Sequence, residues 1–207
     1  MGKTLFNEAE LYLIRNWSRA RLLEESMQEV RDKYRGLGKE VVERIREDHP
    51  ALDWDVVYLC PKSDSGGIGI GRSAWPKGNP YNLGLYVEPL ELELLAAGEE
   101  DEVEDPCAFI STQSASSTES REPSVTQAVN SAASRLLTEE ELKRLKLKGK
   151  ARKPLWYKLP ETRRQLLDML LDGDGRGFVK CISAHFEILA RFIPVLDEVC
   201  AETDGKK

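Results

Sequence analysis

A glycine-rich stretch, GGIGIG at residues 66–71, has the composition of a phosphate-binding loop. A dinucleotide fingerprint needs GxGxxG at a turn from a strand into a helix, so that helix amides meet the pyrophosphate. Here the spacing is GxGxG, and Trp75-Pro76 follows where the helix would have to begin. The glycines therefore predict a strand that packs closely against a large side chain such as Trp75, and we expect no nucleotide cofactor.

An acidic loop, DGDGRG at residues 172–177, has the spacing with which a calcium-binding loop begins. The EF-hand pattern also requires Asp or Asn at its fifth position and Glu at its twelfth. Arg176 and Ser183 occupy these positions. The loop therefore predicts a helix end followed by an aspartate N-cap, and no metal site.

Cysteine and histidine are too scattered to predict a metal site or an activated nucleophile. The residues are Cys60, Cys107, Cys181, Cys200, His49 and His185. No two cysteines have CxxC spacing, and neither histidine has a second histidine near it, so the sequence predicts no zinc site. We expect free, buried thiols, as in proteins of a reducing compartment, and structural histidines.

Carboxylates at strand ends raise the possibility of a nuclease. The expected order of helix, three strands, helix and strand is similar to that of the restriction-endonuclease-like core. That chemistry needs an Asp on one strand and Glu-x-Lys on the next, so that the acids hold a divalent metal beside a lysine. Asp55 opens the first expected strand and Glu88 closes the third, but neither is followed by a lysine two positions later. A degenerate domain of this kind, centred on Asp55 and Glu88, is our third functional hypothesis.

Charge is segregated along the chain, although the net charge is only −6. Residues 88–105 contain nine acidic residues and no basic one, and residues 135–164 contain eleven basic residues against four glutamates. Two such segments either form oppositely charged surfaces that select partners, or they contact each other within the fold.

The basic tract at residues 143–164 also contains aromatic residues, which can stack on nucleic-acid bases. Leucines in the same tract indicate that part of it faces a core. The candidate partner-binding residues are Trp75, Lys143, Arg144, Lys146, Lys148, Lys150, Arg152, Lys153 and Trp156.

The elements that must position these residues are strands in the middle of the chain and helices on both sides. Strands are expected at 55–60, 67–72 and 81–87, with further strands near 107–112 and 155–159, because β-forming residues alternate there between turn residues. Short connections favour an antiparallel meander. We therefore predict an α+β fold with a meander of three to five strands, flanked by long N- and C-terminal helices.

The N-terminal helical region begins at a capping box, Asn7 to Glu10. Apolar residues then recur at intervals of three and four from Leu23 to Ile45, which predicts one long helix that ends at His49-Pro50. We expect this stripe to lie on a core; a coiled-coil seam is the alternative.

Further helices are expected at 125–137, from 139, from Pro160 to 171, and from 178 to 200 with a kink at Pro194. We expect residues 1–207 to form a single domain, with a flexible Ser/Thr-rich loop at about 111–124 and a frayed tail at 203–207.

The functional hypothesis is a non-catalytic protein-interaction or adaptor module with an acidic surface (88–105) and a basic surface (135–164). The alternative is a nucleic-acid-associated protein that binds through residues 143–164. We expect a protein partner, no catalytic residue, no metal and no small-molecule cofactor. No apolar run approaches the roughly 18 residues that span a bilayer, and the first residues, MGKTLFNEAE, lack an apolar signal core. We therefore expect no membrane partner and cytoplasmic localisation.

Overall fold

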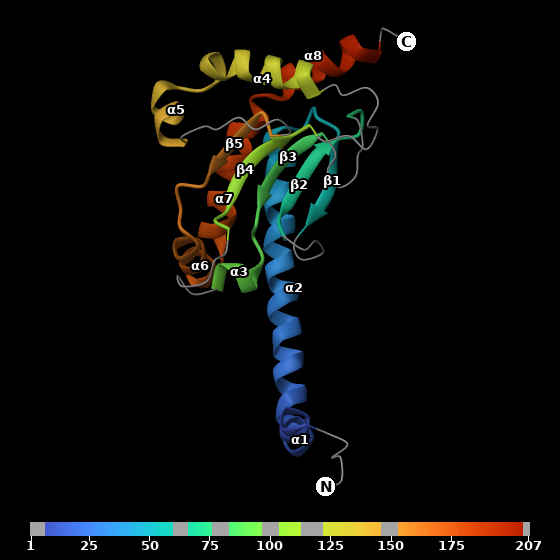
Figure 1. Ribbon diagram of the computed structural model, residues 1–207, viewed down its shortest axis with the longest axis vertical. Helices are drawn as coiled ribbons and strands as arrows, with labels where there is room; N and C mark the ends of the chain where they lie inside the picture. Colours follow the sequence, from blue (N-terminus) through green and yellow to red (C-terminus); the bar gives the residue numbers. More distant parts are fainter. Residues whose placement is uncertain are drawn as a thin grey trace.

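One five-stranded antiparallel sheet lies at the centre of the computed structural model, which describes residues 7–59, 66–75, 83–96, 104–112, 122–145 and 153–204. The strands are β1 (Trp54–Leu59), β2 (Ile68–Arg72), β3 (Gly84–Glu88), β4 (Cys107–Ser111) and β5 (Leu155–Lys158). Their order in the sheet is their order in the chain (Figure 1). The predicted α+β fold with an antiparallel meander is therefore confirmed.

Eight helices accompany the sheet in the described residues. They are α1 (Glu8–Arg15), α2 (Trp17–Asp48), α3 (Leu92–Ala96), α4 (Glu122–Leu136), α5 (Glu139–Leu145), α6 (Arg163–Leu171), α7 (Arg176–Ala190) and α8 (Ile193–Asp204). Figure 1 shows α7 and the C-terminal half of α2 behind the sheet, α4 and α8 across one end of the body, and α3 and α6 at the other end. Among these helices none combines the length and the apolar character needed to cross a membrane.

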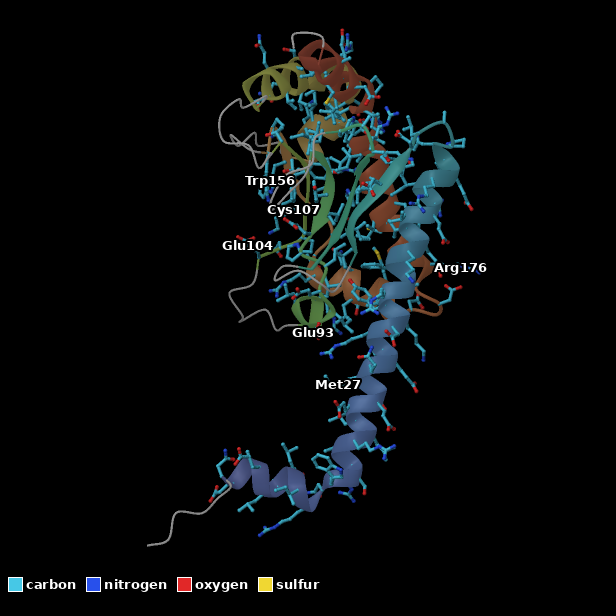
Figure 2. The ribbon with its side chains drawn as sticks, turned by 90° about the vertical axis from the view of Figure 1, so that its right-hand side faces the viewer. Met27, Glu93, Glu104, Cys107, Trp156 and Arg176 are labelled. Atoms are coloured by element: carbon cyan, nitrogen blue, oxygen red, sulfur yellow. The ribbon has the colours of Figure 1, made fainter. Side chains whose placement is uncertain are left out.

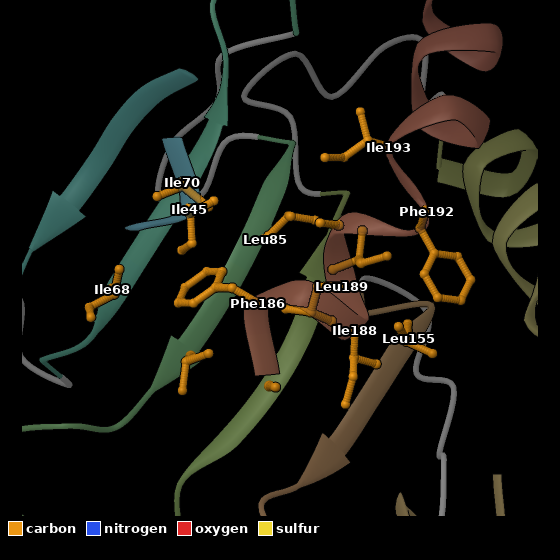
Figure 3. Packing of buried hydrophobic residues seen from close by; sticks show 14 of the residues in the cluster. Ile45, Ile68, Ile70, Leu85, Leu155, Phe186, Ile188, Leu189, Phe192 and Ile193 are labelled. Atoms are coloured by element: carbon orange, nitrogen blue, oxygen red, sulfur yellow. The ribbon is translucent and has the colours of Figure 1, made fainter. Parts of the chain in front are cut away.

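The core lies between the sheet and the helices α2 and α7. Alternate residues of a strand point to the same face, and the isoleucines of β2 share the inner face, as the glycine–isoleucine alternation predicts. Figure 3 shows Phe186 of α7 among Ile45, Ile70 and Leu85, and all four side chains are at most 1% exposed. Phe186 thus joins α7, α2 and two strands in one apolar cluster.

Gly67, immediately before β2, allows the backbones of β2 and β3 to approach closely. A Cβ atom at Gly67 would lie 2.6 Å from the carbonyl oxygen of Val87 in β3. Close packing at this glycine is therefore against the backbone of a neighbouring strand, and not against Trp75.

The predicted capping box at Asn7 with Glu10 is present, and Thr138 with Glu141 forms a second one at the start of α5. A third corrects the predicted start of α6. Thr162 accepts a hydrogen bond from the amide of Gln165, whose side chain accepts one from the amide of Thr162. The helix consequently begins at Arg163, three residues after Pro160.

The sequence predicted that Pro194 kinks one continuous C-terminal helix. The structure instead has two separate helices in this region. The chain ends α7 at Ala190 and begins α8 at Ile193. Pro194 lies in the first turn of α8, where a backbone N–H has no partner within the helix and its loss costs little.

The Ser/Thr-rich loop is shorter than predicted at both ends. Ser111 belongs to β4, and α4 begins at Glu122. The rest of that loop, residues 113–121, lies outside the described residues, as do residues 205–207 of the predicted frayed tail.

Helix α2 lies on the core over only half of its length. It runs unbroken through Gly36 and Gly38, and its buried residues begin at Tyr34, whose hydroxyl donates a hydrogen bond to the carbonyl of Leu90. N-terminal to Tyr34 the helix leaves the body, and α1 turns away from it at Asn16 (Figures 1 and 2). The prediction of a helix laid on a core is therefore correct for the C-terminal half only.

Because Phe186 joins α7 to three other elements of the core, its truncation tests the packing. Phe186→Ala should lower the free energy of unfolding by about 3–5 kcal/mol, since it removes apolar contacts and leaves a cavity. Urea unfolding followed by circular dichroism measures the loss. Leu22→Ala is the control, because Leu22 is 62% exposed and its truncation should change stability by less than about 0.5 kcal/mol. A loss at Phe186 as small as that would contradict this packing.

Candidate functional site

The acidic and basic segments contact each other in three places. Lys153 Nζ lies 3.6 Å from Glu88 Oε1, Lys158 pairs with Asp105, and Arg163 Nε lies 3.9 Å from Asp105 Oδ1. The pairing of β4 with β3 and with β5 brings these side chains together. The two segments therefore neutralise part of their charge within the fold, which is one of the two arrangements that the sequence allowed.

The Glu88–Lys153 pair lies on the outer face of the sheet. The side chain of Glu88 is 7% exposed, and Lys153 Nζ also lies 3.6 Å from the centre of the Phe109 ring. Phe109 stacks on Tyr86, with ring centres 5.3 Å apart, and Trp156 packs against this aromatic cluster. Figure 2 shows Trp156 on the face turned away from α2. A buried carboxylate is costly unless it is paired, so Lys153 has a structural role here.

The other predicted partner-binding residues are dispersed. Trp75 is only 3% exposed, and its indole N–H donates a hydrogen bond to Asp197 at 2.6 Å. Lys143 and Arg144 are exposed on α5. Lys146, Lys148, Lys150 and Arg152 lie outside the described residues. Their binding to a partner stays a prediction, and the described members do not form one surface.

The two carboxylates of the nuclease hypothesis lie at opposite ends of the sheet. Asp55 pairs with Gly71 of β2, and the register between β2 and β3 places both level with Gly84. Glu88 is four residues further along β3, about 14 Å at about 3.4 Å per residue, and two strands away. The fold therefore does not bring Asp55 and Glu88 together around one metal ion, which needs oxygen ligands at about 2–2.6 Å.

A polar network that the sequence analysis missed surrounds His185. Its Nδ1 lies 3.2 Å from the hydroxyl of Tyr157, and its Nε2 lies 2.9 Å from a carboxylate oxygen of Glu161. His185 is 3% exposed and Tyr157 is fully buried. Cys181 lies one helical turn before His185, with its sulfur close to both Glu161 and His185. The spacing of four between Cys181 and His185 was the only local signal.

The protonation states of this network do not suit a nucleophile. Burial raises the pKa of the Cys181 thiol to about 12, and the Glu161 carboxylate beside it acts in the same direction. The hydrogen bond from His185 lowers the pKa of Glu161, and burial raises that of Tyr157. A reactive cysteine needs a stabilised thiolate. Both ring nitrogens of His185 are also engaged, so no free base faces the thiol.

An apolar groove runs along α2 where it leaves the body. The deeper part has a volume of about 750 Å³ and a shallower part of about 370 Å³ adjoins it. Their apolar lining comes from α2, α3 and α6, and includes Val30, Leu37, Leu92, Ala96, Leu167 and Leu171. The ion pair between Arg31 and Glu93 lies at the shallower part.

The projecting part of α2 continues the apolar pattern of the core beyond the body. We call Ala20, Leu23, Met27 and Val30 the distal seam, since their intervals of three and four lead on to the buried Tyr34. Leu23 is 63% exposed, Met27 46% and Val30 48%. Figure 2 shows Met27 on this arm, clear of the sheet. The groove and the distal seam share Leu23, Met27 and Val30, so they form one continuous apolar surface.

Comparison with protein-family models, with curated proteins and with solved structures found no match.

The lowered pKa of Glu161 makes a pH-dependent contribution to stability. A carboxyl group whose pKa falls on folding, here below its usual 4.5, stabilises the folded state above that pH, and the contribution is lost as the pH falls. The unfolding free energy of Glu161→Gln should therefore decline less between about pH 5 and pH 3 than that of the wild type. Urea unfolding at several pH values measures both slopes.

The matched control for this pH series is Glu139→Gln, because the side chain of Glu139 is 90% exposed. Its pH slope should follow that of the wild type. Parallel slopes for all three proteins would show that Glu161 carries no such contribution.

Proposed function

We propose that the protein is a non-catalytic protein-interaction module whose binding surface is the distal seam together with the apolar groove. The observation that carries the proposal is the exposure of large apolar side chains in a heptad-like series on a projecting helix. A helix that faces water on all sides is normally polar all round. A continuous exposed apolar surface marks an interaction site more often than single exposed residues do.

The partner that fits best is a second copy of this chain. In an antiparallel pair of α2 helices that cross at Glu25, Ala20 of one copy lies opposite Val30 of the other, and Leu23 lies opposite Met27. Such layers of facing apolar residues are the unit of coiled-coil packing. The distal seam is therefore complementary to itself, as a two-fold interface requires.

The groove also receives an occupant in this arrangement. Trp17 is 68% exposed, and in the antiparallel pair it comes opposite Lys33 of the other copy. Lys33 lines the deep part of the groove, next to Tyr34. Aromatic side chains contribute about 150–250 Å² each to an interface and dominate its energetics. The second copy thus offers an aromatic anchor to an apolar pocket, which is the arrangement typical of binding hot spots.

Nucleic-acid binding through residues 143–164 is the alternative. Two exposed cations on α5, Lys143 and Arg144, favour it, but Lys153, Lys158 and Arg163 are engaged with acidic residues. An affinity for labelled duplexes that falls steeply with salt, and falls further in Lys143→Glu, would support this alternative.

Cytoplasmic residence remains part of the proposal, and the free thiols of Cys107, Cys181 and Cys200 suit a reducing compartment.

A charge placed in the distal seam should disrupt the dimer. Leu23→Glu buries an unpaired carboxylate at the expected interface, so the dissociation constant should rise by about 100-fold or more. Sedimentation equilibrium of the full chain measures it. Ser18→Glu adds the same charge to the opposite face of α2 and should leave the dimer unchanged. A wild-type chain that is monomeric at concentrations of about 100 μM would overturn the proposed self-association.

Rescue by an opposite charge tests the orientation. A mixture of Leu23→Glu and Met27→Lys chains should form a heterodimer, because residues 23 and 27 face each other only in the antiparallel pair. In a parallel pair the rescue would instead come from mixing Leu23→Glu with Leu23→Lys. Heterodimers in the second mixture alone would contradict the antiparallel arrangement while leaving the dimer intact.

A further inference from the structure

We propose that Glu161, Cys181 and His185 form a binding site for one divalent transition-metal ion of the zinc class. This site is independent of the distal seam, because it lies between α6, α7 and β5 and uses none of the residues of the proposed interface. The sequence contains no complete zinc-binding pattern, and folding brings Glu161 to Cys181 and His185 as the missing ligand.

The three donor atoms converge from two elements. Cys181 and His185 lie four residues apart on α7, so their side chains project from one face of the helix, one turn apart. Glu161 immediately precedes Thr162, whose capping box fixes the first turn of α6. The sulfur, the imidazole nitrogen and the carboxylate oxygen all lie within 4.8 Å of one another.

These distances suit a metal after a small contraction. In a tetrahedral zinc site, ligand atoms at 2.0–2.3 Å from the ion are about 3.3–3.7 Å apart. Glu161 and His185 already approach to 2.9 Å, so the main movement is that of the thiol toward them. Rotation about side-chain bonds of Cys181 and Glu161 supplies a shift on the order of 1 Å without moving the backbone.

The ligand types select the class of ion. Thiolate and imidazole favour zinc and neighbouring transition metals, whereas calcium and magnesium prefer oxygen ligands throughout. A thiolate and a carboxylate together would balance the charge of a divalent cation, with the imidazole neutral. On binding, the thiol loses its proton to solvent, and the imidazole proton moves from Nε2 to Nδ1, where it is donated to the Tyr157 hydroxyl. The sulfur–metal and nitrogen–metal bonds then form with no change of oxidation state.

A second ring of contacts is already built around the histidine. A metal-bound histidine normally has its other ring nitrogen held by a hydrogen bond, which fixes the ring orientation. The hydroxyl of Tyr157 lies 3.2 Å from Nδ1 of His185, which leaves Nε2 for the ion. The side chain of His185 is only 4% exposed and that of Glu161 25% exposed. The ion would therefore reach the site past Glu161 and keep an open fourth position for water.

Cobalt(II) substitution tests the site, because cobalt bound to a thiolate gives a charge-transfer absorption in the near ultraviolet. The reduced, chelator-treated full chain should bind one equivalent of Co²⁺ with this band, and Zn²⁺ should displace it. Cys181→Ala should lose the band. Cys107→Ala should retain it, since Cys107 is a buried thiol on the other side of the sheet.

Two further variants keep the test decisive if Cys181→Ala does not fold. Glu161→Gln alters a partly exposed ligand, and Tyr157→Phe removes only the hydroxyl that holds the ring. Glu161→Gln should weaken Co²⁺ binding by at least 10-fold and Tyr157→Phe by about 10-fold. A wild-type chain without the thiolate band, or a band that survives in Cys181→Ala, would overturn the site and leave Glu161–His185 as a hydrogen-bonded pair only.

Discussion

The packing of α7 beside α2 on the inner face of the sheet is the constraint on which the rest of the structure depends. Phe186 fills the space among Ile45, Ile70 and Leu85 and leaves none of the four more than 1% exposed. Protein cores are packed as densely as organic crystals, so this position also fixes the rotation of α7 about its axis. With that rotation fixed, Cys181 and His185 face the side on which Tyr157 and Glu161 lie. The polar network is thus a consequence of apolar packing on the same helix.

The meander makes neighbours of segments that carry opposite charge. Strands β3, β4 and β5 are joined in order, so the acidic segment that follows β3 and the basic segment around β5 meet across β4. The result is an ion pair between Glu88 and Lys153, with the lysine also over an aromatic ring. Some of the charged residues that suggested two separate partner-binding surfaces therefore pair with each other and stabilise the outer face of the sheet.

The apolar residues of α2 recur with one spacing along the helix, but its two halves lie in different environments. From Tyr34 onward its apolar stripe is buried by α7 and the sheet, and before Tyr34 the same spacing faces solvent. Helices in proteins gain most of their stability from the packing of an apolar face. An arm with this pattern therefore has a physical reason to associate, which links its stability to the proposed function.

The sequence alone determined the local features: the strands, the capping boxes at Asn7 and Thr138, and the breaks between helices, because each depends on residues within a few positions of one another. Its errors at Pro160 and Pro194 were also local, since a proline tolerates several places near a helix start and the competing cap at Thr162 was overlooked. Only the tertiary structure decided which distant groups meet. Tyr157, Glu161 and His185 converge through the placement of α7, and Asp55 and Glu88 are kept apart by strand register. The exposure of the distal seam was not predictable either. A heptad spacing shows that one face of a helix is apolar, but it does not show over what length the rest of the protein covers that face.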